Sequence, residues 1–142
     1  MRRIGEAAQA TGLTPRAIRY YEQLDLLAPA AHLVGGNRRY DDEDLERLRL
    51  IKRLREVVGL SLAEIHTFLE TETERRVLSR EYHATSDPVR RRELLDRVEP
   101  ILRRRVDLLE HKLATVSALL EEERARLERL HLLRGPALAP AR

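Results

Sequence analysis

Apolar residues in the first seventy positions recur at helical spacing, in short blocks separated by turn residues. Ile4 and Ala7 lie on one face of a helix that Gly12 can end. Thr14 is a favourable N-cap, and Pro15 suits the first position of a second helix, where its missing N–H costs nothing. Two short helices joined by a tight, glycine-containing turn predict a helix-turn-helix.

The second of these helices has two different faces. Ile18 and Tyr21 lie three residues apart and form an apolar face, which we expect to pack into the core. Arg16, Arg19 and Tyr20 point elsewhere at helical spacing. This face is therefore a candidate surface for a partner.

A two-stranded wing is predicted after the helix-turn-helix. Extended pieces are expected around residues 26–28 and 39–40, on either side of a connection that contains proline and glycine.

Two further helices follow the wing. Asp41 or Asp42 can cap the third helix, which Gly59 is expected to end. Ser61 and Glu64 form a capping box at the start of a fourth helix. Residues 71–87 are expected to hold a short helix and a loop, and Asp87 with Pro88 marks another helix start.

The second half of the chain carries a heptad repeat from residue 106 onward. Seven of the eight seam positions are apolar, and Glu123 is the exception. Because one helix cannot bury so narrow an apolar stripe alone, the pattern predicts a coiled-coil dimer. Pro100 is expected to kink or restart the helix. The expected dimerisation residues are Val106, Leu109, Leu113, Val116, Leu120, Leu127 and Leu130.

Composition excludes several classes of protein. The chain has no cysteine, which rules out a disulfide framework and a thiolate metal site, and its five histidines show no paired spacing that would suggest a metal. No apolar run is long enough for a membrane span and no signal-peptide pattern follows Met1, so we expect a cytoplasmic protein. Neither a nucleophile with its base, nor a paired-carboxylate cleft, nor a phosphate-binding loop can be identified, so no enzyme and no cofactor are predicted.

Three motifs in a fixed order carry a resemblance to a known family. "IRYYE" begins at Ile18, "RRY" at Arg38 and "LSLAEI" at Leu60. Together they resemble the MerR family of bacterial transcription regulators, over about half the chain. The resemblance implies a mainly α fold, in which a winged helix-turn-helix is followed by a long helix that forms an antiparallel coiled-coil dimer. The expected domains are a winged helix-turn-helix at 1–70, a linking and possible effector region at 71–99, a dimerisation helix at 100–133 and a flexible tail at 134–142.

The same resemblance implies a DNA-binding surface. The second helix would enter the major groove, where arginine can bind guanine with two hydrogen bonds or hold a phosphate. The arginines of the wing would lie beside the DNA backbone. Acidic and basic residues balance within residues 1–70, so DNA binding requires a polarised surface. The expected DNA-binding residues are Arg16, Arg19, Tyr20, Arg38, Arg39, Tyr40, Arg3 and Lys52.

The resemblance further implies a homodimer that binds and distorts palindromic promoter DNA, acts there with RNA polymerase and responds to a small molecule. Without cysteine, thiolate sensing of mercury, copper(I) or gold is excluded. Phe68, Tyr82 and His83 are the candidates to line an effector pocket, the alternative being that they are ordinary core or surface residues. Two other functions stay open: a DNA-binding architectural protein without an effector, and a coiled-coil adaptor that binds protein.

Overall fold

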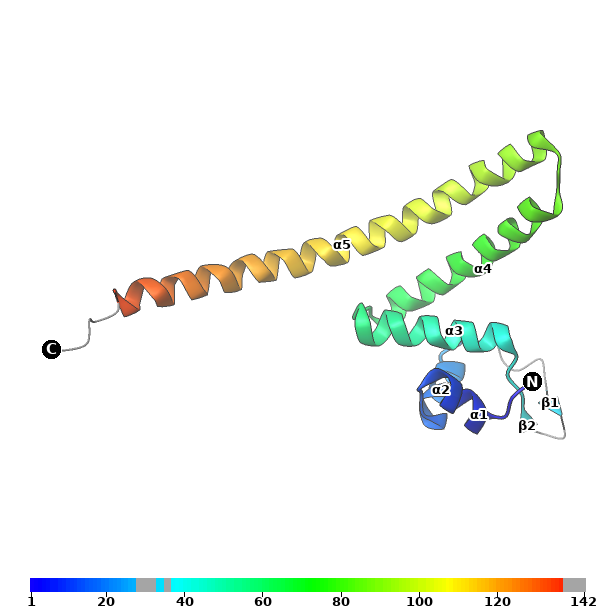
Figure 1. The fold of residues 1–142 in the computed structure, drawn as a ribbon, viewed down its shortest axis with the longest axis horizontal. Coiled ribbons are helices and arrows are strands. Elements are labelled where there is room, and N and C mark those ends of the chain that lie inside the picture. The colour runs from blue at the N-terminus through cyan, green and yellow to red at the C-terminus, as the bar shows by residue number, and fades with distance from the viewer. Residues whose placement is uncertain (28–32, 35–36, 137–142) are drawn as a thin grey trace. The chain divides into compact units, whose positions relative to one another are not determined.

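The computed structural model describes residues 1–27, 33–34 and 37–136, and within this part the chain is mostly helical (Figure 1). The elements in chain order are α1 (Ile4–Thr11), α2 (Pro15–Gln23), β1 (Leu33–Val34), β2 (Asn37–Arg38), α3 (Asp42–Lys52), the π-helical turn η1 (Arg53–Val57), α4 (Leu62–Ala84) and α5 (Pro88–Arg134). The chain divides into two compact units, Met1–Val98 and Glu99–Arg142.

The predicted helix-turn-helix is present. Gly12 ends α1 in the left-handed conformation, with φ 67°. The Thr14 hydroxyl accepts a hydrogen bond from the Ala17 N–H at 3.1 Å, and Pro15 occupies the first turn of α2. Local capping chemistry therefore sets the turn between the two helices.

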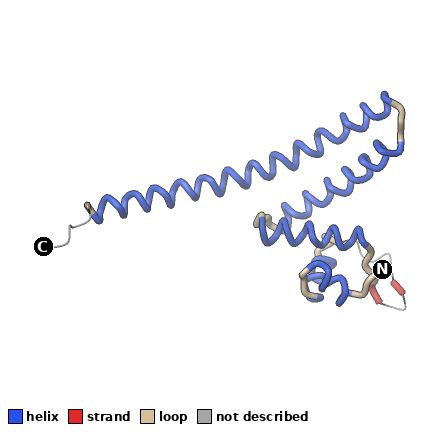
Figure 2. The backbone as a smooth tube through the Cα atoms, in the orientation of Figure 1, coloured by secondary structure: helices blue, strands red, loops and turns tan. Residues whose placement is uncertain are grey.

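Among the described residues of the wing, β1 and β2 form a short antiparallel pair, drawn in red in Figure 2. Leu33 is paired with Arg38, and Val34 with Asn37. The expectation of an extended piece at 26–28 was wrong for its first two residues. Leu26 and Leu27 form a bend after α2, and their side chains are almost completely buried, whereas residue 28 lies outside the described part of the chain.

Capping boxes begin both α3 and α4: the box of α4 was predicted, whereas for α3 only a cap at Asp41 or Asp42 was expected. Asp41 and Asp44 exchange hydrogen bonds between side chain and backbone at 2.8 and 3.0 Å, and Ser61 and Glu64 make the same arrangement. The short helix expected after residue 70 was wrong, because α4 continues to Ala84. No glycine or proline interrupts that stretch of sequence.

The core of the first unit joins the helix-turn-helix to the helices that follow it. Ala7 from α1, Ile18 from α2, Leu48 and Ile51 from α3, and Ile65 from α4 are all completely buried. Because these side chains exclude water together, α2 is held on a rigid support.

In the second unit, α5 carries the heptad repeat with its seam exposed in the single chain. The seam residues are between 39% and 65% exposed, Leu109 least and Leu113 most. Of the two outcomes expected at Pro100, a kink or a restart, the restart does not occur: α5 continues through Pro100, since a long helix can continue past one missing hydrogen bond. Among the described residues, no helix has the length and apolar content needed to cross a bilayer.

Candidate nucleic-acid interface

Helix α2 presents one buried face and one exposed face. Ile18 is completely buried and Tyr21 is 7% exposed. Arg16 and Arg19 are exposed, and Tyr20 keeps 46% of its surface in solvent. The apolar spacing thus fixes the rotation of the helix and directs the two guanidinium groups and one phenol outward. Burial, with a smaller effect from Glu56, raises the pKa of the Tyr21 phenol.

The base of the wing is tied to the last turn of α2. Glu22 accepts a hydrogen bond from the Tyr40 hydroxyl at 2.8 Å and forms an ion pair with Arg38. The backbone of Tyr40 forms a bridge with Arg2: the Arg2 N–H donates to the Tyr40 carbonyl at 2.7 Å, and the Tyr40 N–H donates to the Arg2 carbonyl at 2.9 Å. Burial, together with the hydrogen bond to Glu22, raises the pKa of Tyr40 well above its ordinary value. Residues of three separate segments therefore meet at one point.

The wing residues expected to bind DNA differ in accessibility. Tyr40 is 1% exposed: its ring lies in the core and its hydroxyl donates to Glu22, so it anchors the wing from within the fold. The Arg38 side chain is 49% exposed and pairs with the same carboxylate. Arg39 is half-buried and follows β2 directly.

Arg3 and Lys52 are also placed differently from each other. Arg3 is exposed at the start of α1, where its N–H donates to the Glu6 carboxylate at 2.6 Å. Lys52 is half-buried, and its ammonium group donates to the Gly12 carbonyl at 3.0 Å. This hydrogen bond connects α3 to the end of α1, so Lys52 supports the fold beneath the candidate interface.

Arg47, which sequence reasoning missed, links three segments of the first unit. Its Nε donates to the Leu26 carbonyl at 2.6 Å, and its Nη1 donates to the Thr73 hydroxyl at 3.1 Å. Burial, with a smaller effect from Arg76, lowers the pKa of this guanidinium. Nothing in the helical pattern of α3 distinguishes Arg47 from an ordinary surface arginine, because its partners are distant in sequence.

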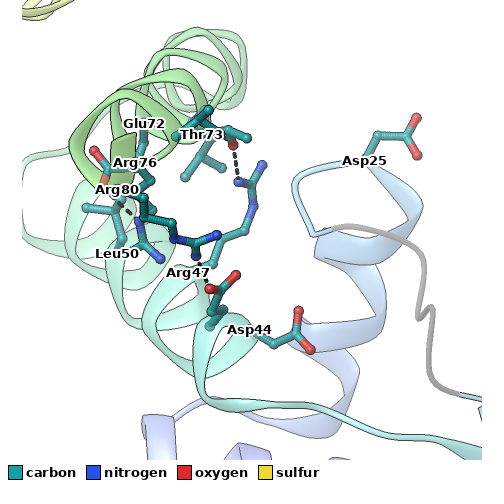
Figure 3. A pocket seen from close by; sticks show the side chains of 11 residues that line it. Asp25, Asp44, Arg47, Leu50, Glu72, Thr73, Arg76 and Arg80 are labelled. Atoms are coloured by element: carbon teal, nitrogen blue, oxygen red, sulfur yellow. Dashed lines mark hydrogen bonds and ion pairs between the residues drawn. The ribbon is translucent and has the colours of Figure 1, made fainter. Parts of the chain in front are cut away.

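A cavity of about 410 Å³ lies beside Arg47, between α3 and α4 (Figure 3). Arg76 and Arg80 of α4 line it together with acidic residues of α3. Arg76 pairs with Glu46 at 3.3 Å, and Arg80 pairs with Glu43. The Arg80–Glu43 pair thus lies at the cavity wall, which also includes the apolar residues Leu50, Leu69 and Val77.

The three candidate effector residues do not form one site. Phe68 is 6% exposed in the core, whereas Tyr82 lies fourteen residues further along α4, about 21 Å at 1.5 Å per residue. The Tyr82 ring stacks under the Arg91 guanidinium at 5.1 Å, and His83 packs against it edge-on at 5.5 Å. Across the described residues, no group of three or more histidine or acidic side chains is arranged to hold a metal ion.

The part of the chain that forms the helix-turn-helix, the wing and the capped helices matches a known protein family. The match is to the sequence model of the family described as MerR HTH family regulatory protein, and it covers residues 2–72. The chain belongs to the MerR family. It is a DNA-binding, MerR-type transcription regulator.

Relatives within the MerR family match most of the chain. The HTH-type transcriptional regulator YfmP of Bacillus subtilis (strain 168) is 33% identical over 119 residues, which cover 84% of this chain and 85% of YfmP. The HTH-type transcriptional regulator ZntR homolog of Haemophilus influenzae is 34% identical over 115 residues, which cover 81% of this chain and 84% of that protein. These relatives are transcriptional regulators, not enzymes.

A solved MerR-family structure supports the fold along the whole length. The transcription regulator PbrR691 from Ralstonia metallidurans CH34, in complex with lead(II), has a TM-score of 0.62 and 26% sequence identity. The match covers 100% of this chain and 91% of that one. The predicted architecture, a winged helix-turn-helix followed by a long helix, is confirmed by this likeness.

Proposed function

We propose that this protein binds palindromic promoter DNA as a homodimer and regulates transcription by distorting that DNA. The observation that carries the proposal is the division of α2 into two faces. Ile18 and Tyr21 fix the helix in the core, while Arg16, Arg19 and Tyr20 are exposed. A helix held in this way can enter the major groove, where arginine distinguishes guanine by two parallel hydrogen bonds.

The remaining contacts in the proposal position the helix on the DNA backbone. Arg39 on the wing and Arg3 at the start of α1 would hold phosphates, and the Tyr20 hydroxyl would donate to another. Lys52 and Tyr40 support this surface from within the fold.

The homodimer is supported by the exposed seam of α5. From Val106 to Leu130 the seam runs about 36 Å along the helix, and its apolar side chains are half-exposed in the single chain. Pairing with an antiparallel copy would bury them and place two α2 helices at a fixed separation. Two-fold symmetry of the dimer is then matched by a palindromic operator.

DNA distortion and an effector complete the proposal. Bending a site of this size costs about 1–6 kcal/mol, which contacts on both half-sites can offset. A small molecule recognised without thiolates would shift the dimer between two arrangements at a promoter also bound by RNA polymerase. The proposal assigns no catalytic activity to the chain.

A gel-shift titration against promoter fragments tests the central claim. We expect salt-dependent binding to a fragment with a palindrome, at least a hundredfold tighter than to a scrambled fragment. Sedimentation of the free protein should give a dimer, and circular-permutation mobility should detect a bend. Binding without a bend or any response to small molecules would favour an architectural protein. Absence of DNA binding at low salt would favour the adaptor.

A further inference from the structure

Glu22 is an acidic residue of α2 whose side chain faces inward. It occupies the last turn of α2, and its side chain is only 4% exposed. Both of its partners come from the wing: Arg38 ends β2, and Tyr40 follows two residues later. The carboxylate thus connects two elements that are sixteen to eighteen residues apart in sequence.

The energetics of a buried carboxylate make this connection specific. Taking a carboxylate out of water is unfavourable unless charge and hydrogen bonds compensate for lost solvation. Here a guanidinium supplies the opposite charge, and the Tyr40 hydroxyl supplies a hydrogen bond at 2.8 Å. Moving the wing away from α2 would break both the ion pair and the hydrogen bond of Glu22, so the wing position that keeps these contacts is preferred.

We propose that Glu22 is a positioning residue for operator recognition, which fixes the wing relative to α2 through Arg38 and Tyr40. The proposal rests on the DNA-binding function proposed above. Glu22 itself does not touch DNA. Arg38 serves mainly as its partner, and Arg39 is the wing residue that is presented to a phosphate.

A positioning role for Glu22 and simple charge repulsion predict opposite effects of its removal on DNA affinity. Removing a negative charge from a DNA-binding surface normally tightens binding, because repulsion of the phosphates is reduced. If Glu22 positions the wing, Glu22→Gln weakens binding instead. Glutamine keeps an acceptor for Tyr40 but loses the ion pair with Arg38.

The test is a salt titration of operator affinity for the full-length protein. We expect Glu22→Gln to bind about tenfold more weakly at every salt concentration, with an unchanged slope of log affinity against log salt. Tenfold corresponds to about 1.4 kcal/mol. Glu56→Gln, at an exposed acid on η1, is the matched control and should bind as tightly as the wild type or slightly more tightly. Affinity of Glu22→Gln equal to or above that of the wild type overturns the proposal.

A second variant tests the same pair from the wing, also in case Glu22→Gln fails to fold. Arg38→Gln should reduce operator affinity by a similar factor, with an unchanged slope of log affinity against log salt. The double variant should bind no more weakly than either single variant. A slope reduced by about 0.9 per half-site would show that Arg38 itself holds a phosphate, and would overturn the proposal. If the wild-type protein does not bind promoter DNA, the proposed function itself is wrong. This outcome is therefore distinguishable from failure of the positioning role of Glu22.

Discussion

The ammonium nitrogen of Lys52 lies 3.0 Å from the carbonyl oxygen of Gly12, so a side chain of α3 caps the carboxyl end of α1. Arg49, one turn earlier on α3, donates to the Ala10 carbonyl at 3.2 Å. Helix carbonyls at this end carry no intrahelical partner and attract cations. The two contacts fasten α1 to α3 at the turn that leads into α2.

Gly12→Ala should destabilise the protein, because the backbone at this position is left-handed and an added Cβ would lie 2.7 Å from the Lys52 nitrogen. We expect a loss of about 1–2 kcal/mol in the free energy of unfolding, measured by urea titration. Gly5→Ala is the matched control. It lies inside α1 with nothing within 4 Å of the added Cβ, so it should be neutral or stabilising by up to about 1 kcal/mol. Equal effects of the two substitutions would contradict this account of the turn.

Arg19→Ala should weaken operator binding by about 1–3 kcal/mol and relax base preference, because it removes a proposed contact with a base edge in the major groove. The measurement is affinity across a set of operators with single base changes. Gln23→Ala, at an exposed position at the end of α2, serves as the control and should preserve both affinity and preference. If Arg19→Ala keeps the wild-type ranking of operators, Arg19 does not bind a base.

Arg39→Ala should weaken binding to all sequences alike, because a phosphate contact carries no sequence information. The slope of log affinity against log salt should fall by about one per half-site. Arg124→Ala, which removes the same charge from an exposed site on α5, should leave the slope unchanged. A change in base preference without a change in slope would argue against phosphate binding by Arg39.

Sequence alone predicted the features that depend on neighbouring residues. Thr14 with Pro15, and Ser61 with Glu64, start helices through contacts only three residues away, so their chemistry is visible in the sequence. The register of the wing was not predictable in this way. Leu26 was expected in an extended piece, but it lies in a bend, and its side chain is buried in the core.

In the candidate site, too, features set by local pattern were predicted and features set by distant contacts were not. Helical periodicity was enough to separate Tyr21, which is buried, from Arg19, which is exposed. Tyr40 and Lys52 were expected to bind DNA from the family resemblance, and their partners within the fold, 18 and 40 residues away, could not be inferred from local pattern. Arg47 was missed for the same reason, since its partners lie 21 and 26 residues away.

Arg47→Met should destabilise the first unit, because the Leu26 carbonyl and the Thr73 hydroxyl would both lose a donor. We expect the free energy of unfolding to fall by about 1–3 kcal/mol, the usual cost of leaving partly buried polar groups unsatisfied. Arg53→Met, at an exposed position on η1, is the control and should change stability by less than about 0.5 kcal/mol. Wild-type stability of Arg47→Met would show that the three segments hold together without this guanidinium.

Leu113→Glu should convert the protein to monomers, because it places a charge at a seam position that the proposed dimer buries. Leu113 is 65% exposed in the single chain, so the substitution should leave the fold of each chain intact by circular dichroism. Sedimentation should then give one chain per particle. Operator affinity should fall at least a hundredfold, because the second half-site no longer benefits from a linked partner.

Ala118→Glu adds the same charge on the outer face of α5, five residues further along and away from the seam, and should leave the dimer intact. Comparing the two variants separates a specific seam from a general effect of charge on a helix that is already rich in acids and bases. If Leu113→Glu sediments as a stable dimer, the heptad register is wrong, and another surface must set the distance between the two α2 helices.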